Sequence, residues 1–178
     1  KVVEASPALV GFKFSAKDLK AFGDLTGVSC DAVISCSGTS FRENILFTHN
    51  GLSGPAALQA SLYWKPGNKL QIDFLPRFKG AEFEEWLLKR KKKGAKSEVK
   101  TLLAELLPKR LADLLCALNL PDHATLPNLP DKKIGEFAGK LRTFVLQPEA
   151  TVGYSKAEVT RGGVDTDELS SKTMECKK

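Results

Sequence analysis

The sequence Val-Thr-Arg-Gly-Gly-Val at 159–164, with Thr-Met-Glu following at 173–175, decides how this chain is interpreted. Paired glycines let a backbone approach a ligand or another chain closely, because no side chain stands between them. The pair lies near the last residue, Lys178, so the partner that it approaches is expected in flanking sequence. The first residues, Lys-Val-Val-Glu, lack an initiator Met and the apolar core of a signal peptide. We therefore expect a domain cut at both ends from a larger protein.

Patterns typical of β-strands occupy both ends of the chain. Apolar residues alternate with polar or small ones in the first half, and short β-prone runs return after residue 143. The clearest of these positions are Val10, Phe12 and Phe14, then Leu70, Ile72 and Phe74, and finally the runs 144–146, 150–152 and 157–160. These patterns predict one β-rich domain built from residues 1–79 and 145–178.

The segment between them, residues 80–144, changes to helical periodicity. Apolar residues recur there at i, i+3, i+4 and i+7, as in the stripe of Leu111, Leu114, Leu115 and Leu118. Four short amphipathic helices are predicted, and they bury their apolar faces best by packing together. The expected fold class is therefore α+β, with a four-helix subdomain inserted into a β domain formed by both ends of the chain.

Composition excludes several classes of protein. The chain has 178 residues, of which 42% are hydrophobic and 27% are charged, as in globular proteins. No apolar run approaches the roughly 18 residues that cross a bilayer. Four cysteines without a C-x-x-C pair, together with only two histidines, predict no metal site. Free thiols of this kind are typical of a reducing, cytoplasmic compartment.

The net charge of +6 includes an uninterrupted basic run, Lys-Arg-Lys-Lys-Lys at 89–93. Such a run can bind phosphates, and the basic helical block 89–110 supports an alternative function as a nucleic-acid-binding module. Cations also suit the C-terminal end of a helix, and Gly94 follows the run as a helix stop would. We favour the helix-end interpretation, so nucleic acid is not expected as a partner, and a role for residues 89–93 in binding stays open.

A second dense motif, Phe-Thr-His-Asn-Gly-Leu-Ser-Gly-Pro, occupies 47–55. Asn50-Gly51 favours a tight turn, and Gly54-Pro55 favours the start of a helix. Ser53 lies on no G-x-S-x-G elbow and has no acid placed to orient His49, which argues against a nucleophilic serine. The exposed amides of this turn are candidates to receive an anion or a carbonyl oxygen. For His49, capping of the turn and a ligand-facing role are both open.

The phosphate-binding motifs G-x-G-x-x-G and G-x-x-x-x-G-K-[ST] do not occur in the sequence. Dinucleotide binding by this chain alone therefore has no support from the sequence.

Several motifs in the same order resemble those of the BaiN/YhiN-like family of FAD-dependent oxidoreductases. They are Phe-Thr-His-x-Gly-Leu-Ser-Gly-Pro at 47–55, Asp-Phe-Leu-Pro at 73–76, Leu-Leu-Pro-Lys-Arg-Leu at 106–111, Ala-x-Val-Thr-x-Gly-Gly-Val at 157–164, and Thr-Met-Glu at 173–175. The resemblance covers essentially the whole chain. Its one noted departure is Cys176, where a Ser is usual.

The resemblance implies that this chain is an insertion that splits a Rossmann-type FAD domain, with a barrel-like β portion and a helical subdomain. It places Thr160, Gly162 and Gly163 near the flavin ring, and Phe47, Thr48, His49 and Ser53 on the substrate side. FAD is expected in the full-length protein and none on this chain alone, which is therefore expected to be inactive by itself. The implied partners are the flanking Rossmann domain, NAD(P)H and a small-molecule substrate. The catalytic residues stay unidentified.

Overall fold

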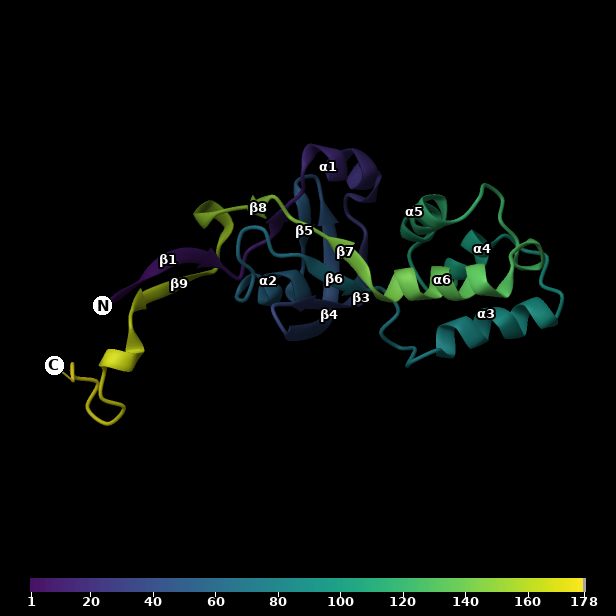
Figure 1. The fold of residues 1–178 in the computed structure, drawn as a ribbon. Helices are drawn as coiled ribbons and strands as arrows, with labels where there is room; N and C mark the ends of the chain where they lie inside the picture. Colours follow the sequence, from purple (N-terminus) through teal and green to yellow (C-terminus); the bar gives the residue numbers. More distant parts are fainter. Residues whose placement is uncertain (178) are drawn as a thin grey trace.

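The computed structural model describes residues 1–177 and arranges them along one long axis (Figure 1). At its centre, strands β3 (Ser29–Cys36) and β4 (Thr39–Thr48) pair as an antiparallel hairpin. The two-residue turn between them, Ser37-Gly38, has positive φ at both positions, 50° and 82°. This backbone twist matches the twist of the strands, which is why such turns are favoured in two-residue hairpins.

Five further strands complete a seven-stranded antiparallel sheet in the order β7-β6-β3-β4-β5-β2-β8. Their bounds are β2 (Phe12–Lys13), β5 (Gly51–Ser53), β6 (Leu70–Asp73), β7 (Phe144–Leu146) and β8 (Ala150–Thr151).

The connection between the two edge strands shows that this sheet is curled. Strand β7 ends at Leu146 and β8 begins at Ala150, so only residues 147–149 join opposite edges. An extended chain covers about 14 Å over those four steps. In a flat sheet, seven strands spaced about 4.8 Å apart would separate the edges by about 29 Å. The sheet must therefore bend toward closure, which confirms the barrel-like fold expected from the resemblance.

Two short helices and an aromatic cluster accompany the barrel. Helix α1 (Ala16–Phe22) begins after Ser15, a residue type favoured at helix starts, and the Ser15 hydroxyl accepts a hydrogen bond from Asp18 N at 3.1 Å. Helix α2 (Pro55–Ser61) packs on β4 and buries Ala56, Ala57 and Ala60. Phe12, Phe22 and Phe47 lie in the core, within one cluster that continues into the helical part.

Helices α3 (Glu82–Lys92), α4 (Val99–Leu103), α5 (Lys109–Asn119) and α6 (Asp131–Arg142) lie between β6 and β7 in the chain. The four predicted helices are therefore present, and they pack together beside the barrel (Figure 1). The predicted stripe is wrong at Leu118, which is 48% exposed, whereas Leu111 and Leu115 are fully buried. The division into residues 1–79 with 145–178 and residues 80–144, as separate units, stays a prediction.

Two arginines connect the helices to the barrel. Arg142, at the end of α6, forms an ion pair with Asp73 at 3.3 Å and donates to the Gly80 carbonyl. Arg110, in α5, donates to the carbonyls of Asp24 and Thr26 at 2.7 and 3.3 Å. Each guanidinium provides several fixed donors, so both junctions are held by hydrogen bonds as well as by packing.

A two-stranded antiparallel ribbon extends from the other end of the barrel and carries both chain ends (Figure 1). It consists of β1 (Val2–Ala8) and β9 (Val159–Val164). Short 3-10 helices occupy Gly23–Leu25, Leu126–Asn128, Tyr154–Lys156 and Thr166–Glu168. Across residues 1–177, the helices are too short or too polar to cross a lipid bilayer.

Candidate functional site

The two adjacent glycines of β9 have different surroundings. Both have positive φ, +98° at Gly162 and +106° at Gly163. A Cβ added to Gly162 would lie 2.3 Å from the carbonyl oxygen of Glu4, at the irregularity of β1 between Val3 and Ser6. A Cβ added to Gly163 would meet no atom within 4 Å. A side chain at position 162 would therefore collide with the ribbon itself, whereas the space beside Gly163 is open.

Apart from the glycines, β9 has three exposed side chains, Val159, Thr160 and Val164, and one anchored side chain. Arg161 instead turns back to the barrel, where it donates to the carbonyls of Leu62 and Trp64 and to the Ser6 hydroxyl at 3.1 Å. These contacts fix the direction in which the ribbon leaves the barrel. Among residues 1–177, β9 pairs with β1 alone, so its other edge presents free backbone donors and acceptors.

The motif at 47–55 runs from the end of β4 through the turn at 49–50 and β5 to the start of α2. The Phe47 ring is only 1% exposed and lies in the core, 6.2 Å from the ring of Phe22. The Thr48 hydroxyl accepts from the amides of Asn50 and Gly51 at 3.3 and 3.2 Å, so it closes the turn. His49 is exposed in the turn, and Ser53 is half-buried.

The glycines of this motif are explained by packing inside the barrel. A Cβ on Gly51 would lie 2.3 Å from the carbonyl oxygen of Phe12, and one on Gly54 would lie 2.7 Å from that of Asn44. The Gly51 amide already donates to Thr48. The close backbone approach that glycines allow therefore serves strand and helix packing at these two positions.

The structure does not bring the two predicted groups of site residues together. In the β2–β5 pair, Phe12 lies opposite Leu52 and Lys13 opposite Gly51, so the His49 turn lies beyond Lys13. The ribbon joins the barrel before β2, where β1 ends at Ala8. His49 and the pair Gly162-Gly163 are therefore at opposite ends of β2, and they do not form one site within residues 1–177.

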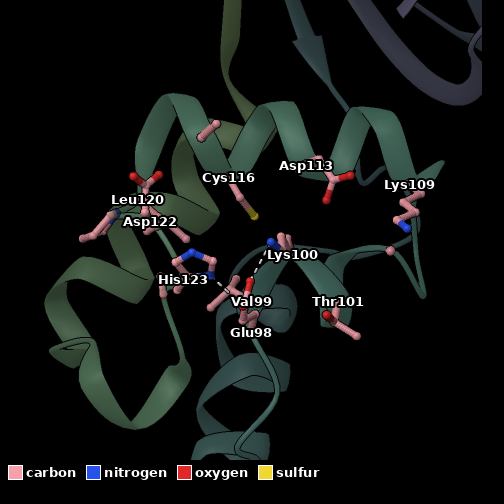
Figure 2. A pocket seen from close by; sticks show the side chains of 14 residues that line it. Glu98, Val99, Lys100, Thr101, Lys109, Asp113, Cys116, Leu120, Asp122 and His123 are labelled. Atoms are coloured by element: carbon pink, nitrogen blue, oxygen red, sulfur yellow. Dashed lines mark hydrogen bonds and ion pairs between the residues drawn. The ribbon is translucent and has the colours of Figure 1, made fainter.

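Sequence reasoning missed a cleft of about 640 Å³ in the helical subdomain (Figure 2). It lies between α4, α5 and the loop after α5, and Glu98, Lys100, Lys109, Asp113, Cys116 and His123 are among the residues that line it. Glu98 contacts His123 Nδ1 at 2.9 Å and Lys100 Nζ at 2.8 Å. Residues 98 and 123 are brought together by backbone pairing, through a bridge between Glu98 and Thr125 and the hydrogen bond from Val99 N to the Ala124 carbonyl, which no spacing in the sequence indicates.

Charged contacts and burial set the ionisation of groups in this cleft. The contact with Lys100, followed by that with His123, lowers the pKa of Glu98 below its ordinary value. Burial raises the pKa of the Cys116 thiol to about 12, with a further contribution from Asp113. Outside the cleft, on β3 of the barrel, burial likewise raises the pKa of Cys30 to about 12. Both thiols are therefore neutral at physiological pH and poor nucleophiles. Within residues 1–177, His, Cys, Asp and Glu side chains form no group of three arranged for a metal ion.

The lowered pKa of Glu98 predicts a pH-dependent contribution to stability. A carboxyl whose pKa falls on folding stabilises the fold above its unfolded pKa, and loses this effect as pH falls through the folded value. Glu98→Gln should therefore lower the melting temperature at pH 7, and its difference from wild type should shrink as pH falls below the ordinary pKa of 4.5. Glu136→Gln, which removes an exposed contact to Lys133, is the matched control. A deficit of Glu98→Gln that is constant from pH 7 to pH 3 would contradict this assignment.

Comparison with known proteins gives a consistent family. Residues 6–159 match the family described as HI0933-like protein barrel and H2TH domain. The ribosomal RNA dihydrouridine synthase of Escherichia coli K12 is 41% identical over 178 residues, covering 99% of this chain and 44% of the relative. The protein of the same name from Haemophilus influenzae Rd is 37% identical over 175 residues, covering 98% of this chain and 43% of the relative.

The chain thus spans less than half the length of these curated relatives. The family match includes the whole curled sheet and all four helices of the helical subdomain, and it ends at Val159, before the paired glycines. The family match agrees with the resemblance to BaiN/YhiN-like flavoproteins at the level of this wider group of proteins. The chain belongs to the HI0933-like family, in its barrel and H2TH domain.

Proposed function

We propose that this chain is the barrel and helical module of a flavoprotein that reduces uridine in ribosomal RNA. The observation that carries the proposal is the identity of 41% and 37% along almost the whole chain to two ribosomal RNA dihydrouridine synthases. RNA thereby replaces the small-molecule substrate that the resemblance implied. A free-standing nucleic-acid-binding module, the alternative interpretation, has no observation that favours it over the flavoprotein.

Dihydrouridine differs from uridine by a hydride and a proton added across the double bond of the base. Reduced FAD would supply the hydride, and NAD(P)H is the class of reductant that renews it. The phosphate-binding motifs of a dinucleotide site do not occur in this sequence. FAD would therefore be held mainly by a flanking Rossmann-type domain of the same polypeptide, into which this module is inserted.

The geometry of the ribbon supports a role beside the flavin. An isolated two-stranded ribbon is only marginally stable, so β1 and β9 are expected to rest on a further domain. In this arrangement Gly163 provides the open space, Thr160 an exposed hydroxyl, and Gly162 the close pairing with β1. Arg161 would set the angle of the ribbon to the barrel through Leu62 and Trp64.

The motif at 47–55 would act on the RNA side of this arrangement. His49 is exposed and Ser53 half-buried, so both are candidates to contact the substrate. Phe47 and Thr48 would contribute indirectly, because the ring is buried in the core and the hydroxyl closes the turn.

The test compares this chain with the longer polypeptide that includes flanking sequence. FAD binding is followed by flavin fluorescence, and dihydrouridine is quantified by mass spectrometry after incubation with NADPH and deproteinised ribosomal RNA. We expect no FAD binding to the chain alone at tens of micromolar, and FAD-dependent dihydrouridine formation by the longer protein. Tight FAD binding by the chain alone would overturn the split-domain arrangement. A longer protein that binds FAD and oxidises NADPH without forming dihydrouridine would overturn the proposed reaction.

A further inference from the structure

We propose that four lysines at the far end of α3 form a surface that binds the phosphate backbone of RNA. These residues, called here the tip lysines, are Lys89, Lys92, Lys93 and Lys96. That the bound polyanion is RNA rests on the proposed function. The location of the surface rests on the structure.

The five cations of the basic run 89–93 have different surroundings. Two of them contact other parts of the helical subdomain, and the other three are exposed to solvent. Arg90 lies over the Trp86 ring, 4.1 Å from its centroid, and forms an ion pair with Glu105 at 2.7 Å. Lys91 donates to the Leu129 carbonyl and to Asp131, both at 2.7 Å. These two cations stabilise the packing of the helical subdomain, and their charges are already paired with Glu105 and Asp131.

The tip lysines are exposed, and within residues 1–177 none of them forms an ion pair. Lys89, Lys92 and Lys93 share one helix face at i, i+3 and i+4, and Lys96 follows just beyond the helix end. Neighbouring lysines at this spacing repel each other, which is unfavourable for the isolated helix. A cation in the last turn is explained by the helix dipole, but that effect is short-ranged and does not require an uncompensated cluster.

The position of the tip lysines indicates the size of the partner. The C-terminal end of α3, which carries them, lies at the end of the molecule opposite the ribbon and both chain ends (Figure 1). A flavin beside Gly163 would therefore be separated from them by the barrel and by α3, whose 11 residues alone extend about 16 Å. One ligand that reaches both ends must be a long polyanion, and an RNA chain meets this requirement where a nucleotide cofactor does not.

The composition of the surface favours contacts to phosphate over other kinds of binding. The large exposed apolar side chains within residues 1–177, such as Tyr63, Leu118 and Val145, lie outside residues 89–96. A membrane-binding surface would place aromatic or aliphatic residues beside the cations. Base stacking would also need exposed aromatics, whereas lysines hold phosphates and position the RNA without reading its sequence.

The experiment measures binding of deproteinised ribosomal RNA to the longer polypeptide with its flanking sequence, at salt concentrations between 50 and 200 mM. The test variant replaces all four tip lysines by Gln. The matched control replaces four exposed lysines of the barrel, Lys17, Lys20, Lys65 and Lys69, by Gln and so changes the net charge equally. We expect the tip variant to bind at least tenfold more weakly, with a slope of log K against log salt shallower by about 3. The control should change affinity less than threefold.

Two further measurements separate the possible failures. Melting temperatures establish that both variants are folded, and dihydrouridine is quantified in the same samples. Weaker RNA binding by the tip variant supports the surface even where the wild-type protein forms no dihydrouridine, an outcome that contradicts the proposed reaction alone. An unchanged affinity and salt slope for the tip variant overturns the surface even where dihydrouridine is formed. If the tip variant loses binding to phosphatidylserine–phosphatidylcholine vesicles and keeps its affinity for RNA, the proposed RNA-binding surface is overturned in favour of a membrane-binding surface.

Discussion

Replacing Gly54 by Ala is expected to lower the free energy of unfolding by about 3 to 5 kcal/mol. Gly54 has φ +92°, a conformation that is strained for any residue with a side chain. Its added Cβ would also lie 2.7 Å from the carbonyl oxygen of Asn44 and 2.9 Å from Leu46 N. These are backbone atoms of β4, the strand at the centre of the sheet, so they cannot move aside as a flexible side chain would.

Gly153→Ala is the control that isolates the steric part of this effect. Gly153 has nearly the same backbone conformation, φ +90° and ψ −176° against φ +92° and ψ 162° at Gly54, but a Cβ there meets no atom within 4 Å. Strain alone should cost about 1 to 3 kcal/mol at that position. Denaturant unfolding followed by Trp fluorescence measures both variants. Equal destabilisation would show that contact between Gly54 and β4 is unimportant.

The local elements were predictable where a single segment contains the physical cause. Alternation at Leu70 and Ile72 specified β6, and the hydroxyl of Ser15 specified the start of α1. Strand β1 was missed because Val2 to Ala5 are all exposed and show no alternation. It is a strand only because β9, more than 150 residues later in the chain, pairs with it. The prediction that Leu118 is buried failed for the opposite reason. Its helical position matched the apolar stripe, but no other element covers it.

The candidate sites show the same limit more sharply. In the sequence Gly162 and Gly163 are equivalent neighbours, and only the register with β1 shows that Glu4 occupies the space beside one of them. The motif at 47–55 was identified correctly as a turn followed by a helix start. Its glycines, however, pack against Phe12 and Asn44. The division of the basic run depends on Glu105 and Asp131, which come from other elements.

Gly163→Leu should weaken FAD binding to the longer polypeptide at least tenfold. If the flavin ring lies against β9, the leucine side chain fills the space that Gly163 leaves open, and the ring can no longer approach the backbone. FAD affinity is measured by fluorescence titration, and the rate of flavin reduction by NAD(P)H is measured on the same samples.

Backbone strain at Gly163 requires a control with the same strain and no expected contact to flavin. Gly153→Leu meets this requirement, because Gly153 has φ +90° and open space around its Cα, like Gly163 at +106°. A loss of affinity confined to Gly163→Leu would place the flavin against β9, since strain is common to both variants. An equal loss in both variants would indicate a general weakening of the structure. Wild-type affinity and reduction rate in Gly163→Leu would remove β9 from the flavin site, and the function of the open ribbon edge would then lie in pairing with another strand.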